Sequence, residues 1–355
     1  MKVFLLWWYR LVLNTFQKIF FRPIAPTEQP IPLLVWRDAH LGDGLLSLAS
    51  LVRIRQNFPN ATIILVSHND GIPGIHFKDY LQDGVADEIW DRSNWTLSQL
   101  IQKVKENRIH HLIALMPYSA SLKWNIVSMV LMKMAGIKRA GGWRKETTFL
   151  AKRCLSRSSF PSELNRLDRL LTDLNLAKIK NLDALPISSD PVELKHPVGE
   201  YLIFAPFTKG VANAWPDENW IRLGIEIQKK QFMPIVIVGG KGDRIKAEEW
   251  IQKWGWGRFE HVSIPALHSL VSQSKMVVGA DSGVVHLANL LKKDNIVLFG
   301  NSDYRGKWAH PENPNQIILY PSKSCTKCLG KRDRPCTCMN YLSIEAVLNA
   351  MASYD

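Results

Sequence analysis

Two runs of alternating strand and helix patterns constrain the fold of this chain more than any other feature of its sequence. Short apolar segments begin near residues 31, 61, 86 and 111, and again near 201, 233, 261, 276 and 295. Most are followed by a longer segment with apolar residues at helical spacing. Such alternation is typical of a parallel sheet with helices on both faces. Because the chain has 355 residues, we expect two α/β domains of this doubly wound kind.

A polar, proline-containing segment after the helix predicted near residues 161–174 separates the two runs. We therefore predict one domain over residues 31–190, a second over 196–340, and a final helix within 341–355. Two such domains that face each other place a ligand cleft at the carboxyl ends of both sheets.

The first 25 residues form an aromatic, amphipathic segment. Arg10, Asn14, Gln17 and Lys18 share one helical face, and aromatic and aliphatic residues lie opposite. The longest uncharged run, Val3–Tyr9, is far short of the ~20 residues that span a bilayer, and no signal-peptide cleavage site follows. We interpret the segment as a helix lying in a membrane surface. The alternative is a helix that packs on the protein's own core.

The chain is strongly basic, with 45 Lys and Arg against 32 Asp and Glu and a net charge of +13. This surplus favours anionic partners such as phosphates or an anionic membrane. The basic residues are spread along the sequence, and no nucleic-acid-binding motif accompanies them, so nucleic acid is not expected as a partner.

The turn Gly42-Asp43-Gly44 places one carboxylate between a predicted strand and a predicted helix. Asp43 could cap the helix, act as a catalytic base, or belong to a phosphate-binding loop. The last interpretation is the weakest, because a carboxylate has the wrong charge to hold a phosphate. The two glycines are expected to leave room for a ligand beside it.

A second strand-to-helix turn, Asp281-Ser282-Gly283, is followed one helical turn later by His286. Asp and Ser are common N-cap residues, so capping alone explains one of them. Glycine at the helix start opens the first-turn amides, which together with the helix dipole form an anion site. We predict a phosphate or nucleotide site here.

A third segment, IFAPFTKGVANAWPDENW, ends a strand in a polar loop that contains Thr208, Lys209 and Asn213. Hydroxyl and ammonium groups in such a loop are suited to a diphosphate, although an ordinary loop is the alternative. The nearby Gly239-Gly240 pair belongs to neither a G-x-G-x-x-G fingerprint nor a Walker loop.

Four of the five cysteines, Cys325, Cys328, Cys336 and Cys338, lie within 14 residues of each other. Their spacing leaves three alternatives open: a zinc site, reduced thiols in a folded loop, or disulfides.

These motifs resemble, in order, the ADP-heptose:lipopolysaccharide heptosyltransferases of glycosyltransferase family 9. The resemblance rests on HLGDGLLSLASLVRIRQNF, FAPFTKGVANAWPDENW, VIVGGKGD, VVGADSGVVHLANLL and the cysteine-containing tail, over roughly residues 33–351. It implies a GT-B fold with an N-terminal acceptor domain, a C-terminal nucleotide-sugar domain, and a last helix that packs back toward the first domain. It also implies an inverting transfer without a catalytic metal or cofactor.

On that resemblance Asp43 matches the general base, and Thr208, Asp281, Ser282, Gly283 and His286 match the donor-binding residues. The chain departs from the family at two positions. Asn213 stands where the family usually has a lysine, with Lys209 nearby, and Asp243 stands where a glutamate is expected.

The function expected is transfer of heptose from ADP-heptose to a lipopolysaccharide core or related anionic glycan, at the inner face of the cytoplasmic membrane. Five basic residues are candidate acceptor contacts: Arg37, His40, Lys123, Arg144 and Lys145. Two alternatives are a related transferase that uses another nucleotide-sugar and a non-catalytic nucleotide-sugar-binding scaffold. The scaffold would require Asp43 to be only a helix cap.

Overall fold

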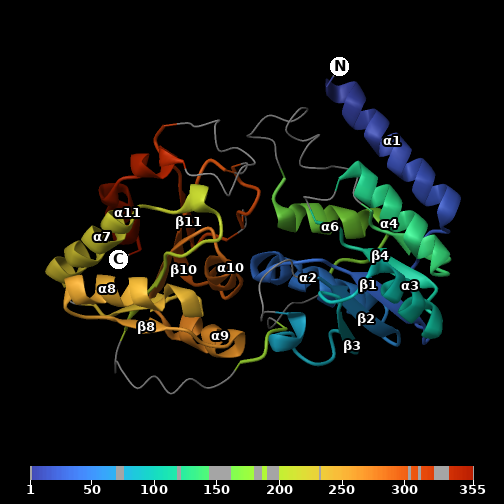
Figure 1. The fold of residues 1–355 in the computed structure, drawn as a ribbon, viewed down its shortest axis with the longest axis horizontal. Helices are drawn as coiled ribbons and strands as arrows, with labels where there is room; N and C mark the ends of the chain where they lie inside the picture. Colours follow the sequence, from blue (N-terminus) through green and yellow to red (C-terminus); the bar gives the residue numbers. More distant parts are fainter. Residues whose placement is uncertain are drawn as a thin grey trace. The chain divides into compact units, whose positions relative to one another are not determined.

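A computed structural model of the chain describes residues 2–68, 76–117, 121–143, 161–179, 186–189, 200–231, 233–302, 305–310, 313–323 and 336–354. Two compact units are present, residues 1–187 and 188–355. Each unit contains one parallel sheet with helices on both of its faces (Figure 1).

The sheet of the first unit has the strand order β3-β2-β1-β4-β5, and all its neighbouring strands are parallel. Its strands are β1 (Pro32–Trp36), β2 (Thr62–Ser67), β3 (Glu88–Asp91), β4 (His111–Ala114) and β5 (Arg139–Gly141). β1 is central and buried, and its side chains alternate between the two faces of the sheet. Leu34 and Trp36 therefore join a core cluster on one face that Leu33 and Val35 do not join.

Helices cover both faces of this sheet. They are α1 (Lys2–Phe20), α2 (Leu41–Asn57), α3 (Leu97–Glu106), α4 (Leu122–Met134) and α6 (Glu163–Asp173), with a short 3-10 turn, η1 (Phe77–Asp79). Residues of α1, α3 and α4 share the core cluster of Leu34 and Trp36. α2 and α6 pack against each other.

The second half of α1 packs on the core of the first unit, as the alternative interpretation of this segment expected. Leu13 and Phe21 are buried, and the Phe21 ring stacks on Trp143 with a centroid distance of 5.1 Å. The helix nevertheless exposes Trp8, Leu11 and Ile19 on its other side. Among the described residues, none of the helices has the length and apolar character that crossing a membrane requires.

The second unit has a six-stranded parallel sheet with the order β11-β10-β9-β6-β7-β8. Its strands are β6 (Leu202–Ala205), β7 (Ile235–Val238), β8 (Arg258–Glu260), β9 (Met276–Ala280), β10 (Asp294–Leu298) and β11 (Gln316–Leu319). The helical elements are η3 (Val211–Asn213), α7 (Asp217–Gln231), η4 (Lys241–Asp243), α8 (Arg244–Trp254), α9 (Ile264–Gln273), α10 (Gly283–Leu290), η5 (Thr337–Tyr341) and α11 (Ile344–Ala352). A tryptophan-rich cluster packs α7, α8 and α11 onto one face.

The structure differs from the sequence-based expectation in two places. The strand expected near residues 261–263 lies earlier, at β8, because Phe259 is the residue that the core buries. The edge strands β5 and β11 were not predicted. Within its own unit α11 contacts α7, β10 and β11, and its packing toward the first domain stays a prediction.

Two leucines of α1 provide a matched test of its packing. Leu13 is buried and Leu11 is about half exposed. Leu13→Ala should lower the free energy of unfolding of the first unit by about 2–5 kcal/mol, because it leaves a cavity. Leu11→Ala should change it by less than about 0.5 kcal/mol. Urea unfolding followed by tryptophan fluorescence measures both, and equal effects would mean that α1 does not belong to this core.

Candidate active site

The candidate site residues gather where the strand order of each sheet reverses. In the first unit the reversal lies between β1 and β4, and in the second between β6 and β9. Ligands of doubly wound sheets bind outside the carboxyl ends of the strands at such points. At each reversal a side chain joins the ends of the two neighbouring strands. Arg37, after β1, donates a 3.1 Å hydrogen bond to the carbonyl of Leu115 after β4. Thr208, after β6, donates a 3.2 Å hydrogen bond to the carbonyl of Asp281 after β9.

Asp43 is the third residue of α2, directly after the turn that follows β1. The N-cap position belongs to His40, whose side chain makes no capping bond. Among the described residues, no N–H or O–H group donates to the Asp43 carboxylate, which is 25% exposed. The nearest cation is Arg37, with 4.0 Å between its Nη2 and Asp43 Oδ1. The carboxylate is therefore held in place by its helix and is not used as a cap.

A buried ion cluster supports the first turn of α2. Arg37 Nη2 donates to the backbone carbonyl of Asp43 at 2.9 Å and to Glu163 Oε1 at 3.2 Å. Arg166 pairs with the same Glu163 carboxylate through its Nε and Nη2. Arg37 was expected to contact the acceptor, but it has no exposed surface. Its bonds instead position the backbone that carries Asp43.

Tyr80 occupies the space beside Gly44, where room for a ligand was expected. A Cβ at residue 44 would overlap the Tyr80 hydroxyl and come within 3.4 Å of the Phe77 ring. Burial raises the pKa of Tyr80; the nearby Arg37 lowers it, and the charges of Asp79 and Asp43 raise it further. The phenol therefore stays protonated beside Asp43. Sequence reasoning did not single out Tyr80, because nothing in the local pattern places it next to this turn.

The remaining acceptor candidates have different surroundings. His40 is exposed three residues before Asp43. Lys123 is exposed in the first turn of α4, which follows β4 at the same reversal of strand order. Arg144 and Lys145 lie outside the described residues.

In the second unit, α10 begins at Gly283 without a side-chain cap. Ser282 is at the N-cap position, but its hydroxyl bonds no first-turn amide. The Ser282 Oγ is buried and has no hydrogen-bond partner among the described residues. An uncapped helix start beside an unsatisfied buried hydroxyl is suited to an anionic ligand, because both can donate to it.

His286 lies between Asp281 and a second histidine, His310. Its Nε2 is 3.6 Å from Asp281 Oδ1, and its Nδ1 is 3.4 Å from His310 Nε2. Burial, and then the charge of His286, lowers the pKa of His310 to about 3. His310 is therefore neutral at physiological pH. It lies in the loop between β10 and β11, where the sequence carries no motif that would have identified it.

The loop residues expected to hold a diphosphate are not equally available. Asn213 is buried, and its Oδ1 accepts a 2.5 Å hydrogen bond from Ser302 Oγ. Asp243 Oδ2 accepts a 2.8 Å bond from the Gly240 amide. Lys209 is exposed. A further cation, Lys307, is buried with its Nζ 4.3 Å from the centroid of the Trp308 ring, and no sequence motif identifies it.

The cysteine cluster lies partly outside the described residues, which omit Cys325 and Cys328. Cys338 is buried in the core of the second unit, and Cys336 is half-buried and packs against the same core. Within the described part of the chain, no group of three or more His, Cys, Asp or Glu side chains is arranged to hold a metal ion.

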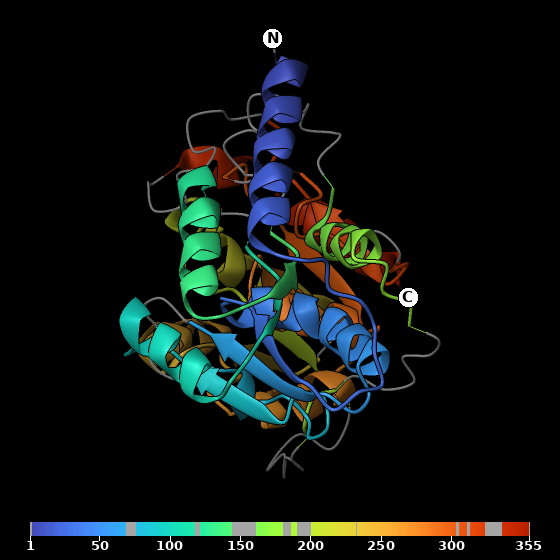
Figure 2. The same cartoon turned by 90° about the vertical axis from the view of Figure 1, so that its right-hand side faces the viewer.

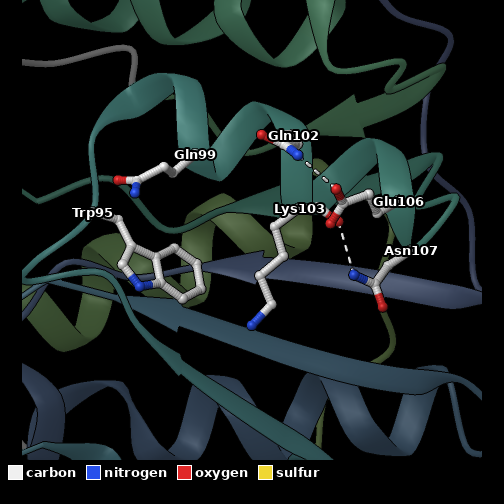
Figure 3. A pocket seen from close by; sticks show the side chains of 6 residues that line it. All are labelled: Trp95, Gln99, Gln102, Lys103, Glu106 and Asn107. Carbon is white, nitrogen blue, oxygen red and sulfur yellow. Dashed lines mark hydrogen bonds between the residues drawn. The ribbon is translucent and has the colours of Figure 1, made fainter.

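A cavity of about 280 Å³ lies on α3, and none of the predicted site residues lines it (Figure 3). It is lined by Trp95, Gln99, Gln102, Lys103, Glu106 and Asn107. The Lys103 ammonium lies 4.6 Å from the centroid of the Trp95 ring and 4.4 Å from that of Trp90. Because the chain's own cation covers these aromatic faces, we assign no ligand to this cavity.

The sequence matches the family model described as glycosyltransferase family 9 (heptosyltransferase) over residues 121–338, more than half of the chain. The chain belongs to this family. Lipopolysaccharide heptosyltransferase 3 of Escherichia coli (strain K12) is 20% identical over 293 residues, which are 74% of this chain and 80% of that protein. The resemblance inferred from the motifs is thus confirmed, and the protein is a glycosyltransferase.

Solved structures support the fold. A family 9 glycosyltransferase from Veillonella parvula DSM 2008 is similar with a TM-score of 0.68 at 16% identity, over 92% of this chain and 98% of that one. The E. coli ADP-heptose lps heptosyltransferase II is similar with a TM-score of 0.62 at 18% identity, over 91% and 98%. The expected GT-B fold class is confirmed.

The ion cluster under Asp43 predicts a large effect of a small substitution. Glu163→Gln removes the carboxylate between two buried guanidinium groups and should lower the free energy of unfolding by about 3–5 kcal/mol. Glu226→Gln is the matched control, because Glu226 pairs with Lys229 on the surface; it should change stability by less than about 1 kcal/mol. Chemical denaturation measures both. Equal small changes would show that the cluster does not stabilise this turn.

The lowered pKa of His310 predicts a pH dependence of stability. The unfolded chain binds a proton at this residue below pH ~6.5, whereas the folded chain does so only near pH 3. The contribution of His310 to stability is therefore fully present above pH ~6.5 and is lost as the pH decreases. His310→Gln should remove about 2 kcal/mol of the loss between pH 7.5 and pH 5. Parallel curves of unfolding free energy against pH for both proteins would contradict this assignment.

Proposed function

We propose that this chain transfers a heptose from ADP-heptose to a lipopolysaccharide core or related glycan, with inversion and without a catalytic metal. Membership in family 9 and the names of its relatives support the choice of donor and acceptor class. The observation that carries the proposal is the state of Asp43, a partly exposed carboxylate that caps nothing and sits at the reversal of strand order.

In this proposal Asp43 is the general base. It takes the proton of an acceptor hydroxyl as that oxygen forms a bond to the anomeric carbon of the donor. The bond from that carbon to the diphosphate breaks on the opposite face, and ADP leaves. Positioned general-base catalysis typically contributes ~10²–10⁴-fold to the rate. Arg37 acts as a positioning residue, because its guanidinium donates a hydrogen bond to the backbone carbonyl of Asp43.

The leaving diphosphate is assigned to the start of α10. Its first-turn amides and the Ser282 hydroxyl are donors, and Lys209 is the exposed cation of the neighbouring loop. Fixed donors of this kind stabilise the charge that develops on a leaving group. The expected activity therefore persists in a chelator such as EDTA.

The acceptor in this proposal is lipid-linked and anionic, and the enzyme acts at the inner face of the cytoplasmic membrane. The net charge of +13 and the apolar residues that α1 exposes support this location.

A related transferase that uses another nucleotide-sugar is the second candidate. Two departures from the family pattern favour it, because the amide oxygen of buried Asn213 and the carboxylate of Asp243 each already accept a hydrogen bond within the protein. Calorimetry with ADP-heptose and with other nucleotide-sugars, followed by transfer assays, distinguishes the two candidates.

Asp43→Asn tests the base directly. Transfer should fall by about 10²–10⁴-fold, while ADP binding measured by calorimetry stays unchanged, because Asn keeps the shape and the donor residues lie in the other unit. Asp83→Asn, at an exposed position, is the control and should keep full activity. Wild-type turnover in Asp43→Asn would exclude this role. Donor binding by the wild-type chain without any turnover would favour the scaffold alternative.

A further inference from the structure

The first unit exposes its large apolar side chains on two neighbouring helices. In the part of the chain that the structure describes, five large apolar residues of this unit are exposed, by 38–69%. They are Trp8, Leu11 and Ile19 on α1 and Val130 and Met134 on α4. Sequence reasoning identified the α1 residues alone.

α1 packs along α4, as Figure 2 shows. Both helices end near the first residues of β5. After α1, the Arg22 amide donates to the carbonyl of Lys138 at 3.0 Å. After α4, a short turn through Gly136 leads to Arg139. Ile19 and Met134, each in the last turn of its helix, therefore belong to one continuous region.

The two parts of the sequence that contain α1 and α4 have no acidic residue. Residues 1–27 and 107–143 together carry nine Lys and Arg and no Asp or Glu. Seven of these cations are exposed and form no ion pair with any other described residue: Lys18, Arg22, Arg108, Lys123, Lys133, Lys138 and Arg139. Elsewhere in this unit half-buried Arg55 pairs with Asp87, and buried Arg53 pairs with Asp168.

We propose that α1, α4 and the residues leading into β5 form one surface that docks on an anionic phospholipid bilayer. Exposed apolar side chains enter the boundary between headgroups and acyl chains, and flanking lysines and arginines contact lipid phosphates. This proposal rests on the proposed function in one respect, namely that the acceptor is lipid-linked and so lies at a membrane. A second copy of this chain is a poor occupant, because the two apposed surfaces would both be positive.

Co-sedimentation with vesicles tests the surface. The probe is extruded vesicles of phosphatidylethanolamine with phosphatidylglycerol, compared with phosphatidylcholine alone. The full-length protein should bind the anionic vesicles and lose binding as salt rises. The double variant Lys133→Gln/Lys138→Gln should weaken partitioning by about fivefold for each charge removed.

Participation of α4 distinguishes this docking surface from membrane binding by α1 alone. Val130→Glu/Met134→Glu should reduce partitioning at least about tenfold, as should Trp8→Glu/Ile19→Glu, because each removes two apolar contacts and adds like charge. Ile245→Glu, at an exposed isoleucine of α8 in the other unit, is the matched control and should bind as wild type.

Three results would overturn the proposal: no binding of the wild-type chain to anionic vesicles, wild-type binding by the α4 variant, or a wild-type dimer that the α1 and α4 variants dissociate. Thermal unfolding and ADP calorimetry confirm that each variant is folded. Transfer to a delipidated, water-soluble acceptor is measured in parallel. A wild-type chain that transfers the sugar but does not bind vesicles would contradict the docking surface alone. A wild-type chain that binds vesicles but does not transfer the sugar would contradict the proposed function alone.

Discussion

The first unit depends on the buried guanidinium of Arg37. A single side chain bonds the carbonyl after β4, the carbonyl of Asp43 in α2 and the carboxylate of Glu163 in α6. Three segments distant in the sequence thus share one cation. Burying that charge costs several kcal/mol unless it is paired and hydrogen-bonded. Arg37 Nη1 and Nη2 make such bonds, while its Nε has no partner among the described residues. The cluster therefore favours one arrangement of the first turn of α2. The same cost explains why Arg166 and Glu163 are buried with it.

The second unit also buries polar side chains near its candidate site, but several of them are uncharged. His286 and His310 meet in a buried environment beside Asp281, and burial keeps His310 uncharged there. The buried Asn213 fits the same pattern, because its amide links η3 to the loop after β10 through Ser302.

Sequence patterns predicted the central strands well, because buried strands of a parallel sheet are short apolar runs between turn residues. β5 was missed because its three residues, Arg139–Gly141, contain no such run and are placed by backbone pairing with β4. The location of Asp43 and of the Asp281–His286 segment at strand-to-helix turns was also predictable. Tyr80, Glu163 and His310 were not, since they come near the site through contacts between segments far apart in the sequence. The burial of Arg37 could not be predicted either, because an arginine next to a strand is more often exposed.

The pairing of Arg22 with β5 has a consequence for the open edge of the first sheet. β5 is the outermost strand, and Arg22, two residues after α1, forms a parallel bridge with it, with the Ala140 amide donating to the Arg22 carbonyl at 3.1 Å. An unprotected edge strand can pair with another chain. The N-terminal segment therefore also shields a strand that would otherwise recruit neighbours. A shortened chain that begins at β1 would uncover both this edge and the face of Trp143, and so would be prone to aggregate.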